Sequence, residues 1–314
     1  MGKYILKRLL WMIPIVLGVT IIVFTLMYFV PGDPAQMMLP DDATQQDIQE
    51  MREYLGLNKS YGERLFTYMR NAFIYGDFGN SYRLKTPVMP ELLQRLPRTA
   101  LLAAMTMVIS MAVGIPLGVM AAVHQNGPAD RISMVLSLVG VSMPSFWLAL
   151  MLVLLFSVKL KWLPATGFEG FKYFILPALS GALGGIAGQA RQTRSSMLEV
   201  IRSDYITTAR AKGVAERKVI YSHALPNALI PIITISGTAF GHMLGGTLIL
   251  ETIFSIPGIG TYIINGVNNR DYPVIQGGVI FLAVVFGLMM LLVDLAYAFV
   301  DPRIKSQYMG KKGK

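Results

Sequence analysis

Histidine and serine are the residues of this chain that could support hydrolysis, and their placement argues against it. The 314-residue sequence contains three histidines, His124, His223 and His242. A serine hydrolase inside a membrane needs a nucleophile and a histidine brought together within the bilayer. His124 and His223 fall at the ends of apolar runs or in a loop, and no Gly-x-Ser-Gly-type segment accompanies His242. We therefore predict that the chain is not an enzyme and has no catalytic residues.

Ion-driven transport and metal binding receive as little support from the ionisable residues. A proton- or ion-driven carrier usually holds acidic or basic groups near the middle of the membrane. Asp294 is the acid that falls inside an expected apolar helix, and it lies close to one end of that helix, where we expect it to hydrogen-bond a neighbouring helix. With no cysteine and three scattered histidines, no metal site is predicted. The energy source is expected on another chain.

The most distinctive polar stretch is DYITTARAKGVAERKVIYSHALP, residues 204–226, which lies between two long apolar segments. Gly213 predicts the end of one short helix, and VAERKVIYSHAL predicts a second helix before Pro226. This helical pair is either an interfacial anchor on anionic lipid or a docking surface for a cytosolic partner. The first helix is expected to run on from the apolar segment before it, with one apolar stripe: Met197, Ile201, Tyr205 and Thr208 or Ala209.

The elements that must position this stretch are membrane helices. The chain is 54% hydrophobic and 15% charged, with a mean hydropathy of +0.52, whereas soluble domains carry roughly 25% charged residues. The charge-free run 252–269 holds three glycines, one proline and three asparagines, so we expect a surface or re-entrant segment there and not a membrane span. Six apolar runs are long enough to span a bilayer: 9–30, 99–123, 132–157, 174–193, 227–250 and 275–299.

Charge predicts the orientation of these six helices. Most lysines and arginines outside residues 31–98 fall on one side of the membrane, so the positive-inside rule places both termini in the cytosol. The pI of about 9.7 is then a topology signal and not a sign of nucleic-acid binding. We predict three regions: 1–30, a cytosolic start and the first helix; 31–98, an extracytoplasmic segment; and 99–314, a five-helix core with a cytosolic loop at 194–226 and an extracytoplasmic segment at 251–274.

The extracytoplasmic segment 31–98 is too patterned for a simple connection. DDATQQDIQEMREYLG offers Asp42 or Thr44 as an N-cap and Gly56 as a stop. YGERLFTYMRNAFIYG repeats the amphipathic pattern. We expect two short helices there, forming either a folded cap over the helices or a docking surface for an outer partner.

A substrate path is harder to place. Small residues cluster at 180–190 and 236–246, and they favour either close helix packing or a path between helices that rock. The segment VSMPSFW, around Pro144, is typical of a broken helix end. The candidate path residues are Met143, Phe146, Trp147 and His242.

The stretch 204–226 resembles the E-A-A-x3-G-x9-I-x-L-P loop of ABC importer permeases. Thr207 and Thr208 stand where that pattern has Glu and its first Ala, and His223 stands in place of Ile. The form DYITTARAKG is similar to the variant of the peptide/nickel permease family. Four positions agree with the general pattern: Ala209, Gly213, Leu225 and Pro226.

Other segments resemble the same family, in its dipeptide/oligopeptide first-permease type, and together they cover nearly the whole chain. They are LKRLLWMIPIVLGVTIIVF followed by PGDPA, YGDFGNSY, FWLALMLVLLFSVKLKWLPATG, GGTLILETIFSIPGIG, NRDYPVIQG and LLVDLAYAFVDPRI. The resemblance implies an all-α integral membrane protein with the type I ABC importer permease fold. It also implies the plasma (inner) membrane of a bacterium or archaeon.

The resemblance further implies partners and a coupling mechanism. A second homologous permease, two cytosolic ABC ATPases and an extracytoplasmic substrate-binding protein are expected beside this chain and the lipid bilayer. Arg210 and Lys212 are expected to pair with acidic groups of an ATPase. The chain contains no G-x4-G-K-[ST] phosphate loop, so no cofactor is expected on it, and ATP and Mg would be bound by the ATPases. The expected coupling residues are Asp204, Tyr205, Thr208, Ala209, Arg210, Ala211, Lys212, Gly213, Leu225 and Pro226.

The predicted function is a permease subunit of an ATP-driven importer for di- or oligopeptides. Nickel or a metal chelate is the alternative cargo within the family, although a bare metal path would prefer histidine and carboxylate ligands. From another class, the alternative is a stand-alone secondary carrier or channel.

Overall fold

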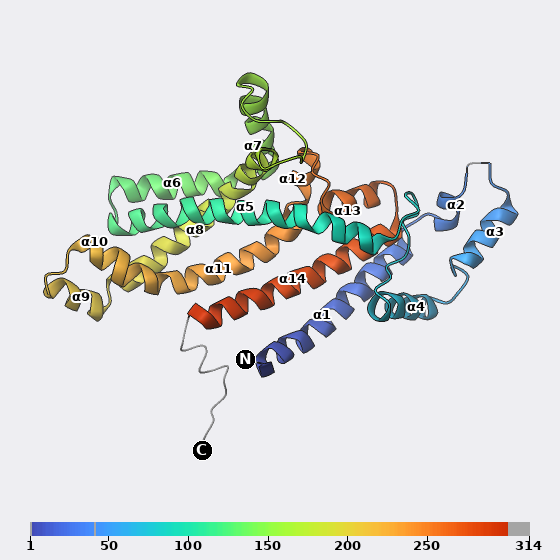
Figure 1. Cartoon of the computed structure of the whole chain (residues 1–314), viewed down its shortest axis with the longest axis horizontal. Helices are drawn as coiled ribbons and strands as arrows, with labels where there is room; N and C mark the ends of the chain where they lie inside the picture. The colour runs from blue at the N-terminus through green and yellow to red at the C-terminus, as the bar shows by residue number, and fades with distance from the viewer. Residues whose placement is uncertain (1, 41, 301–314) are drawn as a thin grey trace, which may run out of the picture. The chain divides into compact units, whose positions relative to one another are not determined.

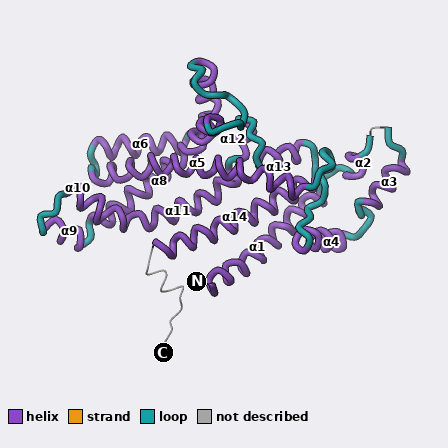
Figure 2. The backbone as a smooth tube through the Cα atoms, viewed as in Figure 1, coloured by secondary structure: helices purple, strands orange, loops and turns teal. Residues whose placement is uncertain are grey.

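The computed structural model of the chain describes residues 2–40 and 42–300, and its named elements within that range are helices (Figures 1 and 2). In chain order the α-helices are α1 Gly2–Phe29, α2 Pro34–Met38, α3 Gln45–Tyr54, α4 Tyr61–Ile74, α5 Val88–Val123, α6 Pro128–Ser142, α7 Ser145–Leu152, α8 Lys172–Ile201, α9 Asp204–Ala211, α10 Glu216–Lys218, α11 Leu225–Gly246, α12 Leu248–Ile253, α13 Ile259–Asn268 and α14 Tyr272–Val300. Two π-helices, η1 Val153–Lys159 and η2 Val219–Ala224, continue α7 and precede α11.

Four helices of the described chain, α1, α5, α8 and α14, are each long and apolar enough to cross a membrane. Two bent pairs raise the count to six if each pair is one span. One pair is α6 with α7 and η1, and the other runs from Glu216 to Gly241. The six apolar runs of the sequence therefore correspond to helices, although two of the runs are bent.

The structure corrects the bounds of several predicted helices. α1 begins at Gly2 instead of residue 9, and α8 ends at Ile201 instead of residue 193. α5 begins at Val88 instead of residue 99, and Pro90 lies in its first turn, where a missing N–H is tolerated. The helix expected over 132–157 is broken at Met143 and Pro144, where the chain bends by 97°. The segment 252–269 holds the end of α12, a break around Pro257 and then α13, as its glycines and proline suggest.

Contacts divide the described chain into two compact units. One comprises residues 99–256 with the part of α14 from Leu288 onward, and the other comprises residues 2–98 with 257–287. Each unit has its own packing and is described separately. The predicted boundaries at residues 30 and 98 stay predictions.

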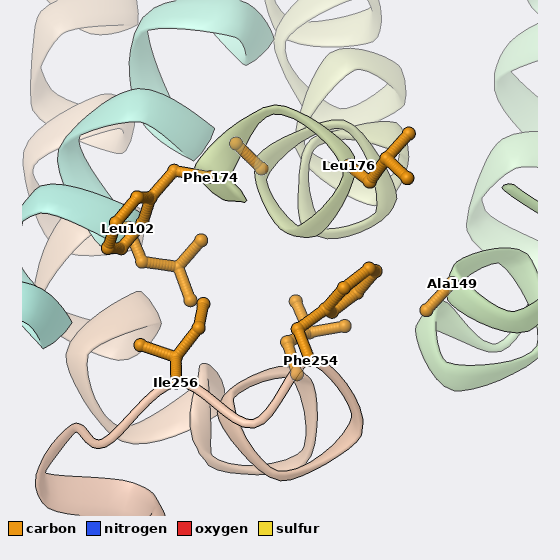
Figure 3. Packing of buried hydrophobic residues seen from close by; sticks show 8 residues of the cluster. Leu102, Ala149, Phe174, Leu176, Phe254 and Ile256 are labelled. Atoms are coloured by element: carbon orange, nitrogen blue, oxygen red, sulfur yellow. The ribbon is translucent and has the colours of Figure 1, made fainter. Parts of the chain in front are cut away.

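In the first unit, α8 packs against α6, α7 and α11. A hydrophobic core joins α8 to α5, α7 and the end of α12, and Figure 3 shows Phe254 and Ile256 extending toward the side chains of the other helices. The buried residues of this core are Leu102, Ala149, Phe174, Leu176, Ala178, Leu250, Phe254 and Ile256.

Glycines bring α5 and α8 into close contact. A Cβ atom at Gly114 would lie 2.6 Å from the Cβ of Gln189, and one at Gly118 would lie 2.5 Å from the carbonyl oxygen of Ala190. Gly185 of α8 packs in the same way on Ser110 of α5. Part of the small-residue cluster at 180–190, including Gly185, is therefore used for close packing, as in membrane helix pairs.

We expect Gly118→Ala to destabilise the first unit by about 1–3 kcal/mol, because the added methyl group meets backbone that cannot move aside. The measurement is the thermal unfolding of the purified complex in detergent. Gly184→Ala is the matched control, since a Cβ at Gly184 of α8 would have no atom within 4 Å. Equal stability of the two variants would contradict the close packing.

In the second unit, α3 and α4 confirm the two short helices expected in segment 31–98. Thr44 caps α3 in a capping box with Asp47, and Ser60 caps α4 in the same way with Glu63. The hydrogen bond from the Thr44 side chain lowers the pKa of Asp47 below its usual value. Gly56 ends α3 with a φ of +65°, a conformation that glycine adopts without strain.

Asp271 organises the loop of residues 77–87 in the second unit. Its carboxylate accepts hydrogen bonds from the Ser81 hydroxyl at 2.5 Å, the Tyr82 N–H at 3.0 Å and the Arg83 N–H at 3.3 Å. Asp271 is itself buried immediately before α14. One carboxylate thus ties the loop to the start of the last long helix.

We expect Asp271→Ala to release this loop, because two backbone N–H groups lose their acceptor at a cost of about 1–3 kcal/mol each. Faster proteolytic cleavage within residues 77–87 of the purified complex is the expected result. Asp271→Asn keeps one acceptor oxygen and should be intermediate. Cleavage of Asp271→Ala at the wild-type rate would show that the carboxylate does not hold the loop.

Candidate functional site

The segment 204–226 folds as α9, α10 and η2, and it begins at a break in the helix before it. α8 ends at Ile201, and the chain restarts at Ser203, whose extended backbone precedes the first turn of α9. The predicted continuous stripe is therefore wrong beyond Ile201. The restart shifts the helical phase by one residue, so Ile206 is fully buried and Tyr205 is 48% exposed.

Ile206 anchors α9 in a second hydrophobic core of the first unit. Its neighbours come from α5, α8, η2 and α11, so four elements hold this short helix in place. The half-buried Ala209, Val214 and Leu225 pack against the same core. The buried members are Val119, Ala122, Met197, Ile206, Val219, Ile220, Ala224 and Ala228.

The opposite face of α9 is exposed and polar. Of the predicted coupling residues, Ala209 and Leu225 are half-buried, and the others are exposed. Leu225 begins α11, and Pro226 lies in its first turn. The exposed set is Asp204, Tyr205, Thr208, Arg210, Ala211, Lys212, Gly213 and Pro226.

Gly213 forms the turn after α9. Its φ is +76°, in the left-handed region that favours glycine. Its N–H donates to the carbonyl of Arg210 at 2.9 Å, and the N–H of Val214 donates to the carbonyl of Ala209 at 3.3 Å. A Cβ at Gly213 would have no atom of the chain within 4 Å, so the residue presents bare backbone to its surroundings.

Arg210 is engaged within the chain. Its guanidinium donates to both carboxylate oxygens of Glu216, at 3.0 and 2.7 Å, and these bonds raise the pKa of Arg210. The two side chains are 38% and 56% exposed, so the pair contributes at most about 1 kcal/mol. Within the chain, Glu216 thus engages Nε and one terminal nitrogen of Arg210. The pairing of Arg210 with an acidic group of an ATPase stays a prediction. Lys212 remains exposed beside it.

A buried ion pair ties the same region to α6. Asp130, in the first turn of α6, accepts two hydrogen bonds from Arg194 of α8, at 2.6 and 2.7 Å. It also accepts one from the N–H of Asn126 at 2.9 Å. Arg202 donates to Gln125 at 3.2 Å, which adds a second link from the end of α8 to the same loop. The spacing of charges in the sequence gave no sign of this pairing across 64 positions.

The candidate path residues lie away from this segment in the chain. Met143, Phe146 and Trp147 lie at the break between α6 and α7, and both aromatic side chains are nearly half exposed. His242 lies on α11, and its side chain is outside the described residues. A role of these residues in a path is untested.

The structure adds buried polar residues that the sequence interpretation passed over. Gln189 of α8 donates to Ser236 of α11 at 2.7 Å. Glu251 lies inside α12 and is fully buried, where it accepts hydrogen bonds from Thr99 at 2.7 Å and Thr247 at 3.2 Å. Glu251 is therefore a second acid, besides Asp294, that lies in one of the apolar regions of the chain. Within residues 2–40 and 42–300, no group of three or more histidine and acidic residues is placed to hold a metal ion.

The described chain thus combines helices long and apolar enough to cross a membrane with a charged helical pair that connects α8 to α11. Two family models match the chain. Residues 114–306 match the binding-protein-dependent transport system inner membrane component, and residues 1–103 match the N-terminal part of such membrane components. The chain belongs to this family of inner membrane permeases.

Curated relatives match over nearly the whole chain. The dipeptide transport system permease protein DppB of Alkalihalophilus pseudofirmus is 43% identical over 333 residues, which cover 97% of this chain and 100% of that protein. The glutathione transport system permease protein GsiC of Escherichia coli K12 is 39% identical over 305 residues, covering 97% and 99%. Both relatives are named as permeases of transport systems.

Solved structures support the fold. The MetNI methionine ABC transporter, in inward-facing conformations, superposes with a TM-score of 0.59 at 17% identity, covering 68% of this chain and 98% of that chain. The type I ABC importer permease fold expected from the sequence is thus confirmed. The protein is a permease subunit of an ABC importer.

Proposed function

We propose that this permease carries di- or oligopeptides. The observation that supports this proposal most strongly is the end-to-end similarity to a dipeptide permease, at 43% identity. A relative named for glutathione, itself a short peptide, points to the same class of cargo. Nickel or a metal chelate is the weaker alternative, since no cluster of metal ligands occurs among the described residues.

The proposed assembly contains this chain, a second homologous permease, two cytosolic ATPases that bind ATP and Mg, and an extracytoplasmic binding protein. The cytosolic side holds both termini and the segment 194–226. The chain itself carries no catalytic residue in this proposal. Hydrolysis belongs to the ATPases, because the sequence has no phosphate loop of its own.

The segment 194–226 is the proposed coupling site. A helix that transmits force to the membrane domain must be rigid, and Ile206 together with the core around it fixes α9 on four neighbouring elements. The surface that meets an ATPase is the exposed face with Asp204, Tyr205 and Thr208, continued by the bare backbone at Gly213. Movement of α9 would reach α6 through the Arg194–Asp130 ion pair.

The cargo proposal is tested by native mass spectrometry of the complex captured with its binding protein. A bound peptide of two or more residues is the expected ligand. A nickel ion or a metal chelate in its place would overturn the peptide assignment, and it would leave the permease assignment untouched.

A further inference from the structure

One exposed face of α4 carries more large apolar side chains than is usual for a helix surrounded by water. Phe66, Phe73 and Ile74 recur at helical spacing along it, and their exposed fractions are 69%, 42% and 70%. Tyr75, directly after the helix, is 70% exposed. The opposite face holds the buried Ala72 and packs within the second unit. A stripe of this kind indicates that something apolar covers the helix.

α4 is fixed to α1 near the C-terminal end of that membrane helix. The Tyr61 hydroxyl forms a 2.7 Å hydrogen bond with Thr25, and the rings of Tyr61 and Tyr68 both pack on Phe24, with centroid distances of 5.8 and 5.6 Å. Arg64 stacks over the ring of Tyr28 at 5.2 Å. Three residues spread over about two turns of α4, from Tyr61 to Tyr68, thus contact little more than one turn of α1, so the two helices cross instead of running side by side (Figure 1).

The length of α1 sets the depth of this crossing. Arg8, near the N-terminal end of the candidate span Tyr4–Phe29, belongs at the level of the lipid headgroups. The hydrocarbon core is about 30 Å thick, and 20 residues at a rise of 1.5 Å cover that distance, which brings the far edge of the core to about Tyr28. Phe24 lies about 6 Å inside that edge. An interfacial helix buries its apolar face by about 5–10 Å, which matches the level at which α4 crosses α1.

We propose that α4 is an interfacial helix, and that its face of Phe66, Arg70, Phe73 and Ile74 lies in the lipid of the leaflet at the C-terminal end of α1. The aromatic rings occupy the boundary between headgroups and acyl chains, where aromatic side chains are enriched. Arg70 extends its guanidinium to the headgroups along the same face. Glu63 lies in the first turn, where its carboxylate completes the cap of the helix with Ser60 and stays hydrated.

The chain contains no cysteine, so single labels can test this proposal in the assembled complex. Phe66→Cys and Ile74→Cys are labelled with an environment-sensitive fluorophore in nanodiscs. Ile22→Cys on the exposed side of α1 is the lipid control, and Gln49→Cys on the polar α3 is the water control. Wild-type complex treated with the same reagent gives the background from the partner subunits.

The expected result is that labels at 66 and 74 lose fluorescence to nitroxide-bearing lipids as the label at 22 does, and resist iodide in the water. Iodide quenching equal to that at 49 would overturn the proposal. Protection from both quenchers would also overturn it, because a protein subunit would then cover the face. Quenching by iodide that disappears when the binding protein is added would assign the face to that protein instead of lipid.

Discussion

Gly213→Val is expected to abolish peptide uptake and the coupling of ATP hydrolysis, while the chain still inserts into the membrane. The backbone at Gly213 has a φ of +76°, and a β-branched residue held there is strained by about 1–3 kcal/mol. The turn between α9 and α10 must therefore change shape. Uptake into membrane vesicles and binding-protein-stimulated ATPase activity are the two measurements.

Activity could be lost in Gly213→Val because the turn changes shape or because the added side chain blocks a partner. The variant Gly213→Asn separates these two reasons. Asparagine tolerates the left-handed conformation, so the turn is kept while a side chain is added at a position that is open within the chain. Full activity of Gly213→Asn with none for Gly213→Val would mean that only the turn matters. Loss in both variants would mean that a partner approaches the bare backbone closely. Normal uptake by Gly213→Val would count against the coupling role of the segment.

Breaking the Asp130–Arg194 pair is expected to have the second large effect. The Asp130 side chain is 5% exposed and the Arg194 side chain 25%, so Asp130→Ala leaves a largely buried guanidinium without its carboxylate. Removing one partner of a buried pair costs about 3–5 kcal/mol. The N–H of Asn126 loses its acceptor as well. Thermal unfolding of the purified complex should begin at a clearly lower temperature.

The exchanged pair, Asp130→Arg with Arg194→Asp, is the matched control. It restores opposite charges across α6 and α8 and should recover part of the lost stability. The number of peptides carried per ATP tests transmission of movement, because a pair that only stabilises the fold would leave that ratio unchanged in the folded fraction. Wild-type stability and a wild-type ratio in Asp130→Ala would contradict both roles.

The features that sequence reasoning located correctly are those set by local chemistry. Thr44 caps α3 and Gly56 stops it, because a short hydroxyl side chain and a residue without Cβ suit those two backbone conformations. The turn at Gly213 and the break near Pro144 follow from the same local rules. Hydrophobic run length located the spans for a comparable reason, since bilayer thickness acts on each helix separately.

The missed features depend on contacts between distant residues. Ile206 became the anchor of α9 because the helix restarts at Ser203, and periodicity alone does not reveal a change of phase. Glu251 is buried because Thr99, 152 positions earlier, supplies a hydroxyl. Gly114 and Gly118 can be recognised as helix-contact residues only in the tertiary structure, where α8 packs against them. Such pairings require the tertiary fold.

The most direct test of an ATP-driven permease is uptake of a labelled dipeptide into proteoliposomes that contain the purified complex, with binding protein added outside. ATP is enclosed in one set of liposomes and omitted from another, and a third set holds this chain and its partner permease without the ATPases. We expect accumulation only where the ATPases and ATP are both present. Uptake that continues without ATP, or by the permease chains alone, would instead establish a stand-alone carrier or channel.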